Sequence, residues 1–210
     1  MSDHFIIRLQ SALDNELPGE MAHADLMPIN RPFSQKALKR ATNYRKSAVG
    51  LVLYEEADSI RCVLIQRPQY DGTHGGQVSF PGGKMDSSDP DLEYTAKREC
   101  MEEIALEPTR MKTIGLLSEV YIPVSKFLVQ PYVFYVESLP ELKPDEREVD
   151  EIFSFEIETL LDDSRLKRTN LTFRNGFNQK NIPYFDIEGK VVWGATAMIL
   201  SEFKAVLKSF

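Results

Sequence analysis

The chain has 210 residues, of which 42% are hydrophobic and 10% aromatic, a composition typical of a folded protein with a sizeable core. Its formal net charge of −7 argues against a general nucleic-acid-binding protein, because the surfaces that bind phosphate backbones are normally basic. The two cysteines, Cys62 and Cys100, exclude a disulfide framework and a cysteine-based metal site.

The N-terminal part of the chain predicts one helix followed by a long connection. Apolar residues recur at helical spacing from Phe5 to Leu13, which predicts a helix with one face packed on the rest of the protein. The next stretch contains three prolines before Arg45 and reads as a connecting segment. We therefore expect residues 1–45 to pack on a main domain that spans residues 46–210.

Strand and helix patterns then follow one another irregularly. Two β-rich runs, at 47–54 and 60–66, are joined by a short polar link, and this pattern predicts a hairpin. Helices are expected at 95–105 and at about 195–207. Further strands are predicted at 77–80, 113–120, 128–136, 151–155, 169–174 and 183–187, and a short helix at 157–161. Because no regular βαβ repeat is present, we predict an α/β fold with a central mixed sheet flanked by helices.

Residues 75–106 carry the strongest chemical signal. On a helical wheel of about 100° per residue, Glu102 and Glu103 lie within about 60° of Glu99, so three carboxylates share one face. Oxygen ligands of this kind suit Mg²⁺. The glutamates alone also fit an ordinary solvated acidic face. The Gly82-Gly83 turn favours a metal site, because glycine lets the backbone approach an ion closely and offer a carbonyl oxygen.

Residues 83–106 resemble the Nudix box, G-x5-E-x7-R-E-U-x-E-E-x-G-U, in which U is a bulky aliphatic residue. The pattern positions are matched by Gly83, Arg98, Glu99, Cys100, Glu102, Glu103 and Leu106, with Cys100 at a position that is usually aliphatic. This sequence departs from the pattern at three points: Asp89 replaces the early glutamate, one extra residue precedes Arg98, and Ala105 replaces the late glycine.

A second resemblance lies just upstream. Residues 64–84, LIQRPQYDGTHGGQVSFPGGK, are similar to the LLTxRSxxLxxHxGxVxFPGG element of coenzyme A pyrophosphatases within the Nudix family. The shared positions are Arg67, His74, Gly76, Val78, Phe80, Pro81, Gly82 and Gly83. Pro68 replaces the usual serine, and the middle of the element differs at 70–72.

The resemblance implies a Nudix-like α/β/α sandwich and a set of site residues. Glu99, Glu102 and Glu103 would hold Mg²⁺ or Mn²⁺ with the Gly83 carbonyl as a further ligand. Arg98 would hold Glu99 in place through a charge-assisted hydrogen bond. The expected substrate-binding residues are Arg67, His74, Gln77, Ser79, Phe80 and Lys84.

Two further sets of residues are candidates for a functional role, although each also has an ordinary structural explanation. Glu148, in a loop between core strands, is a candidate for an additional carboxylate that binds metal or activates water, or it is a plain loop charge. The basic residues Lys36, Lys39, Arg40, Arg45 and Lys46 would suit the 3′-phosphate of coenzyme A, although scattered solvated side chains explain them better.

The resemblance implies a Nudix hydrolase over residues 46–210 that converts coenzyme A or an acyl derivative to 4′-phosphopantetheine and adenosine 3′,5′-bisphosphate. One alternative is hydrolysis of another substrate, such as a dinucleotide, a nucleotide sugar or a nucleoside triphosphate. A different class is a non-catalytic domain that senses a nucleotide. We expect a small-molecule partner, no nucleic acid and, by family analogy, a homodimer. The chain has no long apolar run and no secretory signal pattern, so we expect a cytoplasmic protein without a membrane partner.

Overall fold

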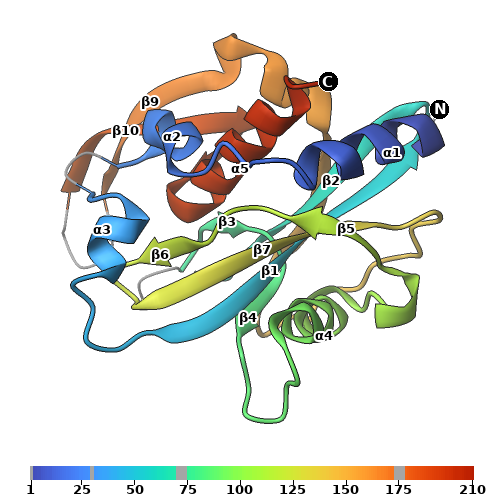
Figure 1. Ribbon diagram of the computed structural model, residues 1–210, viewed down its shortest axis with the longest axis horizontal. Helices are drawn as coiled ribbons and strands as arrows, with labels where there is room; N and C mark the ends of the chain where they lie inside the picture. Colours follow the sequence, from blue (N-terminus) through green and yellow to red (C-terminus); the bar gives the residue numbers. More distant parts are fainter. Residues whose placement is uncertain (1, 29–30, 70–74, 173–177) are drawn as a thin grey trace.

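The computed structural model describes residues 2–28, 31–69, 75–172 and 178–210 (Figure 1). In chain order the helices are α1 (Ser2–Leu13), α2 (Glu20–His23), α3 (Ser34–Leu38), α4 (Leu92–Ile104) and α5 (Gly194–Leu207). The strands are β1 (Arg45–Glu56), β2 (Ser59–Gln66), β3 (Val78–Ser79), β4 (Gly82–Lys84), β5 (Lys112–Leu116), β6 (Val120–Ile122), β7 (Phe127–Tyr135), β8 (Glu151–Glu156), β9 (Leu166–Thr172), β10 (Asn178–Ile187) and β11 (Lys190–Trp193). Short 3₁₀ helices lie at Ala24–Leu26, Pro108–Arg110, Ile157–Leu161 and Asp163–Arg165.

The main sheet is mixed and is built around β1. The strands follow the order β3-β2-β1-β7-β5, with β1 parallel to β7 and antiparallel to β2. Strand β1 changes partner along its length: Ser47–Val49 pair with β4, whereas 53–56 pair with β2. The first half of β1 therefore carries the Gly82-Gly83 turn, and the second half carries the hairpin.

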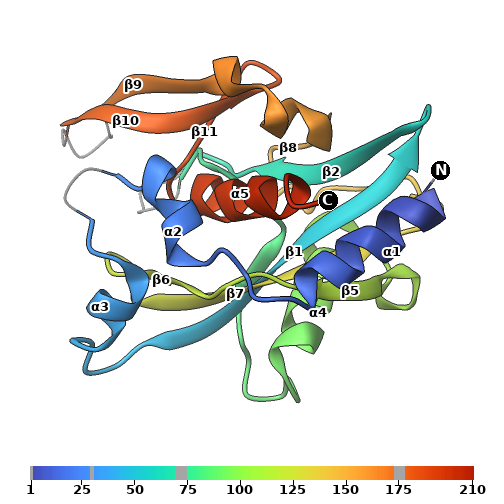
Figure 2. The ribbon, with the colours of Figure 1, turned by 45° about the horizontal axis from the view of Figure 1, so that its top comes forward.

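Helices cover both faces of this sheet, as Figures 1 and 2 show. Helix α4 lies on one face, while α1, α2 and α5 lie on the other, and the small sheet β11-β10-β9 lies beyond α5. The prediction of an α/β fold with a central mixed sheet flanked by helices is confirmed. None of the helices in the described ranges combines the length and the apolar character that crossing a bilayer requires.

Side chains of β1 alternate between two apolar cores, as the pleat of a strand requires. Val52 and Tyr54 belong to the core under α4, whereas Leu51 and Leu53 belong to the core that α1 and α5 cover. A Cβ atom at Gly50 would lie 2.9 Å from the Cys100 sulfur, so this glycine lets α4 approach β1 closely. The position of α4, and of its glutamates, is thus set by buried apolar contacts.

Helix α4 begins three residues before the predicted start at residue 95. The Asp91 side chain caps it by accepting a hydrogen bond from the Tyr94 amide at 2.7 Å, and this cap moves the start to Leu92. Strand β11 is not among the elements predicted from the sequence. It forms after a tight turn in which Glu188 and Gly189 both have positive φ.

A buried carboxylate joins the N-terminal segment to the last helix. Glu202 of α5 has no exposed surface and accepts hydrogen bonds from the Gly19 amide at 2.9 Å and from the Ser118 hydroxyl at 2.6 Å. Its other oxygen lies 3.2 Å from the His23 ring nitrogen and accepts from the Ser118 amide at 3.0 Å. Hydrogen bonds to both oxygens compensate the cost of burying this charge.

Helix α4 ends at Ala105, which has φ 54° and ψ 33°, the left-handed conformation that favours glycine. Because an alanine Cβ is strained there, we predict that Ala105→Gly raises the free energy of unfolding by about 0.5–1 kcal/mol. Urea denaturation of the two proteins measures the change. Ala96→Gly, in the middle of the same helix, is the control and should lower stability by about 1 kcal/mol or more. Equal destabilisation by both substitutions would contradict this explanation of the helix end.

Candidate functional site

The three glutamates near the end of α4 differ in their exposure to solvent. Glu103 is 1% exposed, the Glu99 side chain is 12% exposed, and the Glu102 side chain is 57% exposed. On the opposite side of the helix, Cys100 and Ile104 are fully buried against the sheet. Helical spacing thus brings all three carboxylates to one side of α4, where they sit beside β4.

Gly83 gives Glu99 room to lie directly against the backbone of β4. A Cβ atom built on this glycine would be 2.4 Å from the Glu99 Oε1 atom and 2.6 Å from its Oε2 atom. Any side chain here would therefore displace the carboxylate. The backbone of the double-glycine strand therefore lies next to a carboxylate. A cation that binds both backbone and side-chain oxygens needs such an arrangement.

Arg98 is the hub of an ion-pair network at the start of the site. Its guanidinium donates to both oxygens of Asp89 at 3.0 Å, to Glu99 at 2.9 Å and to Glu102 at 2.8 Å. It also donates to the carbonyl of Lys84 at 3.1 Å, which ties the end of β4 to α4. The hydrogen bonds from Arg98 lower the pKa of Asp89 to about 2. Asp89, in the position of the early glutamate, is thus the ionised partner that fixes Arg98.

Arg67 and Gly82 hold the deepest carboxylate. Arg67 donates to one Glu103 oxygen at 3.0 Å, and the Gly82 amide donates to the other at 2.8 Å. Arg67 also donates to the Gly82 carbonyl at 3.1 Å. Burial raises the pKa of Glu103 to about 7 although Arg67 and the Gly82 amide act in the opposite direction. Arg67 therefore points into the carboxylate cluster.

The loop before β8 brings a fourth carboxylate to the cluster. The amides of Lys143 and Asp145 donate to the carbonyls of Ile104 and Glu103, at 3.1 and 3.0 Å, so the loop is fastened to the end of α4. Glu148 is exposed in this loop. Burial is the largest cause that raises the pKa of both Glu99 and Glu103, and the charge of Glu148 adds a smaller effect in the same direction. The structure therefore places Glu148 within electrostatic range of the glutamates of α4.

The other predicted substrate-binding residues have different surroundings. His74 lies outside the described residues. The Gln77 carbonyl accepts a hydrogen bond from the Arg67 amide at 3.0 Å, and Ser79 has a buried hydroxyl with no hydrogen-bond partner in the described part of the chain. Phe80 is 1% exposed and packs in the apolar core, whereas Lys84 is exposed.

The chemistry of these side chains fits a hard divalent cation. Within the described ranges, no three acidic, histidine or cysteine side chains are already gathered in ligand geometry around one point. The nearby groups are nevertheless carboxylate and backbone oxygens, the ligands that Mg²⁺ and Mn²⁺ prefer. Burial is the largest cause that raises the pKa of Glu99, against the contact with Arg98, and the charges of Glu102 and Glu148 add smaller effects in the same direction.

Two features of this site differ from the sequence-based predictions. Asp89 departs from the Nudix box, yet its two contacts with Arg98 make it the anchor of that network. Its position six residues after Gly83 was the available signal. Arg67, which is among the expected substrate-binding residues, pairs with Glu103, 36 residues away, and no local pattern predicts this contact.

Comparison with known proteins agrees with this geometry. The model of the NUDIX domain family matches residues 44–174. The human protein named mitochondrial coenzyme A diphosphatase NUDT8 is 39% identical over 130 residues, which are 61% of this chain and 54% of that protein. The chain thus spans little more than half of that relative. A Salmonella typhimurium protein named uncharacterized Nudix hydrolase NudL is 30% identical over 200 residues, 95% of this chain and 91% of that one.

A solved structure supports the fold alone. The Nudix hydrolase RenU from M. smegmatis superposes with a TM-score of 0.57 at 14% identity, over 88% of this chain and 94% of that one. The family model covers the strand that pairs with the double-glycine turn, the whole of α4 and the loop of Glu148, and the match to NudL extends over nearly the full chain. The chain belongs to the Nudix family.

Proposed function

We propose that this protein is a metal-dependent pyrophosphohydrolase that cleaves the diphosphate of coenzyme A or an acyl derivative, releasing 4′-phosphopantetheine and adenosine 3′,5′-bisphosphate. The observation that carries the proposal is the Glu99 carboxylate lying against Gly83, with Glu102 and Glu103 on the same side of α4 and Glu148 in the loop that is fastened to the end of this helix. The choice of coenzyme A is supported by the 39% identity to a human coenzyme A diphosphatase.

The residues of the site have separate tasks in this proposal. Glu99, Glu102 and Glu103, with the Gly83 carbonyl, would hold Mg²⁺ or Mn²⁺. When bound, the metal neutralises diphosphate oxygens and lowers the pKa of the attacking water. Arg98 orients Glu99 and Glu102 through the hydrogen bonds described above. Glu148, which is exposed and next to the cluster, is suited to accept the proton of that water.

Two other functions compete with this one. Another nucleoside diphosphate derivative as substrate would use the same carboxylates, so the site geometry does not separate it from coenzyme A. A non-catalytic nucleotide sensor would not need these carboxylates for hydrolysis, and the presence of the Arg98, Glu99, Glu102 and Glu103 set favours an enzyme.

The substrate is tested with a panel of coenzyme A, acetyl-coenzyme A, ADP-ribose, diadenosine tetraphosphate and a nucleoside triphosphate. We expect the largest kcat/KM for coenzyme A or its acetyl ester, with products identified by mass spectrometry. Turnover should stop when the metal is chelated and return when Mg²⁺ or Mn²⁺ is restored. A larger kcat/KM for another member would transfer the assignment to that substrate. If no member of the panel is hydrolysed, the proposal that the protein is a pyrophosphohydrolase is refuted.

Glu99→Gln tests the carboxylate cluster. An amide cannot supply the negative charge that binds the cation, so we expect kcat/KM to fall by at least about 100-fold. The control is Glu93→Gln on the same helix, where the side chain pairs with Lys97 and Thr113 away from the cluster. Both variants should show an unchanged circular dichroism spectrum. Equal rates for Glu99→Gln and the control would contradict the proposed role.

The raised pKa of Glu103 predicts a pH dependence of stability in the metal-free protein. An ordinary glutamate titrates near 4.5, whereas Glu103 in the folded chain titrates near 7, so folding favours its protonated form. Its contribution to stability is complete below pH 4.5 and is lost as pH rises towards 7, by roughly 3 kcal/mol.

Urea denaturation in the presence of a chelator measures this effect. The free energy of unfolding of the wild type, minus that of Glu103→Gln, should fall between pH 4.5 and 7, because groups shared by the two proteins cancel. Added Mg²⁺ should oppose the fall, since a bound cation favours the ionised carboxylate. A difference that does not change with pH would show that Glu103 ionises normally.

A further inference from the structure

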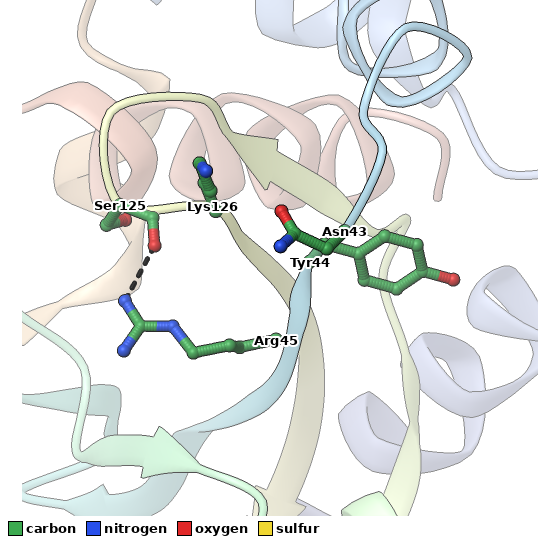
Figure 3. A pocket seen from close by; sticks show the side chains of 5 residues that line it. All are labelled: Asn43, Tyr44, Arg45, Ser125 and Lys126. Carbon is green, nitrogen blue, oxygen red and sulfur yellow. Dashed lines mark hydrogen bonds between the residues drawn. The ribbon is translucent and has the colours of Figure 1, made fainter.

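A hollow lined by residues with polar or charged groups lies at the start of β1, apart from the carboxylate cluster. Figure 3 shows the five residues that line it, and its volume is about 350 Å³. The lining residues are Asn43, Tyr44, Arg45, Ser125 and Lys126. They provide two cations, an amide, a phenol and a hydroxyl, and none of the five is acidic. This composition suits an anion.

Arg45 is held in place for such a ligand. Its Nη2 atom donates to the Ser125 carbonyl at 2.7 Å, and its guanidinium carbon lies 4.0 Å from the centre of the Phe127 ring. The backbone amide of Arg45 also donates to the Lys126 carbonyl at 2.8 Å. A guanidinium has five N–H donors, and these contacts leave most of them available. A fixed side chain loses little entropy when it binds a phosphate.

The positive charge of the pocket is not neutralised by neighbouring side chains. Neither Arg45 nor Lys126 forms an ion pair with another residue in the described parts of the chain. In addition, the Ser125 hydroxyl is buried and has no hydrogen-bond partner among those residues. A buried hydroxyl without a partner is costly unless a ligand completes it.

The pocket is joined to the candidate active site by β1 itself. Arg45 precedes Ala48 by three residues, and Ala48 is the strand partner of Gly83. At about 3.3 Å per residue, the two positions on β1 are roughly 10 Å apart along the strand. Because they are an odd number of residues apart, their side chains lie on opposite faces of the sheet, and one ligand reaches both around the end of β1, where Arg45 is the first residue. This separation is comparable to the span of a nucleoside that carries phosphates on both sides of its ribose.

We propose that Arg45, Lys126 and Ser125 bind a phosphate monoester, and that this group is the additional ribose phosphate of a nucleoside diphosphate substrate. A monoester carries nearly two negative charges at neutral pH, which match the two cations, and its oxygens accept from the hydroxyl. The inference rests on the proposed function, since it places the diphosphate of the same molecule at Glu99. The pocket then selects substrates that have the extra phosphate.

Three other basic residues of this region lie elsewhere. Lys36, Lys39 and Arg40 line a different hollow together with Phe33, Gln35 and the acidic Glu20. The carboxylate of Glu20 accepts from the Gln35 amide at 2.6 Å and adds a negative charge to that hollow. We therefore assign the phosphate to Arg45 and Lys126.

Calorimetric titration of the metal-free protein tests the pocket without any turnover. The probes are adenosine 3′,5′-bisphosphate, adenosine 5′-monophosphate and inorganic phosphate. We expect the 3′-phosphate to lower Kd by at least about tenfold in the wild type, and this ratio to approach one in the double variant Arg45→Gln/Lys126→Gln. Lys112→Gln is the control, because Lys112 pairs with Tyr135 at the other end of β7.

The results separate a substrate subsite from other anion sites. A ratio that survives in the double variant would overturn the proposal. Inorganic phosphate that binds the wild type as tightly as the bisphosphate would also overturn it, because the pocket would then be a free-anion site.

A kinetic comparison distinguishes failure of the pocket from failure of the proposed function. With coenzyme A and 3′-dephospho-coenzyme A as substrates, the wild-type ratio of kcat/KM values should favour coenzyme A by about tenfold, and the double variant should lose that preference. Hydrolysis of both substrates with equal kcat/KM by the wild type would refute the pocket and leave the pyrophosphatase intact. Hydrolysis of neither would refute the proposed function, while the titration would still decide whether the pocket binds a phosphate monoester.

Discussion

A single guanidinium organises the glutamate face of this protein. Arg98 contacts Asp89, Glu99 and Glu102 at once and also reaches back to the carbonyl of Lys84. Like charges on neighbouring helical positions repel one another, so the cluster needs a fixed counter-charge in order to remain on one side of the helix. Because Asp89 is buried, the counter-charge is itself anchored from the loop before α4. The proposed metal site, which is built mainly from the carboxylates of α4, depends on this arrangement.

The four glutamates of the site are chemically identical but differ in burial and in their neighbours. Glu103 is buried and held by Arg67 and a backbone amide, Glu99 lies against glycine, and Glu102 and Glu148 face the solvent. Burial raises the pKa of the inner carboxyl, whereas exposed carboxylates remain ready to meet a cation or a water. In the proposed function, these different environments suit the four glutamates to separate roles in binding a metal and accepting a proton.

Local patterns predicted the face of α4 because helical periodicity depends only on neighbouring residues. They could not predict contacts that depend on the path of the chain. Arg45 meets Ser125, 80 residues later, only because β1 runs parallel to β7, and a parallel pair leaves no local signature. In the same way, basic residues that are close in the sequence lie in different places in the structure. Arg45 lines one hollow with Lys126, whereas Lys36 lines another with Glu20.

The buried Glu202 has a consequence for how much of the chain is one cooperative unit. The family model begins at residue 44 and ends at residue 174, yet Glu202 takes its hydrogen bonds from Gly19, His23 and Ser118. A fragment trimmed to the family boundaries would lose α5 and expose the apolar face it covers. A fragment that lost only the N-terminal segment would strand an anion in the interior without two of its donors, at a cost of several kcal/mol. The segment that carries Gly19 and His23 and helix α5 are therefore tied by buried hydrogen bonds to the region that the family model matches.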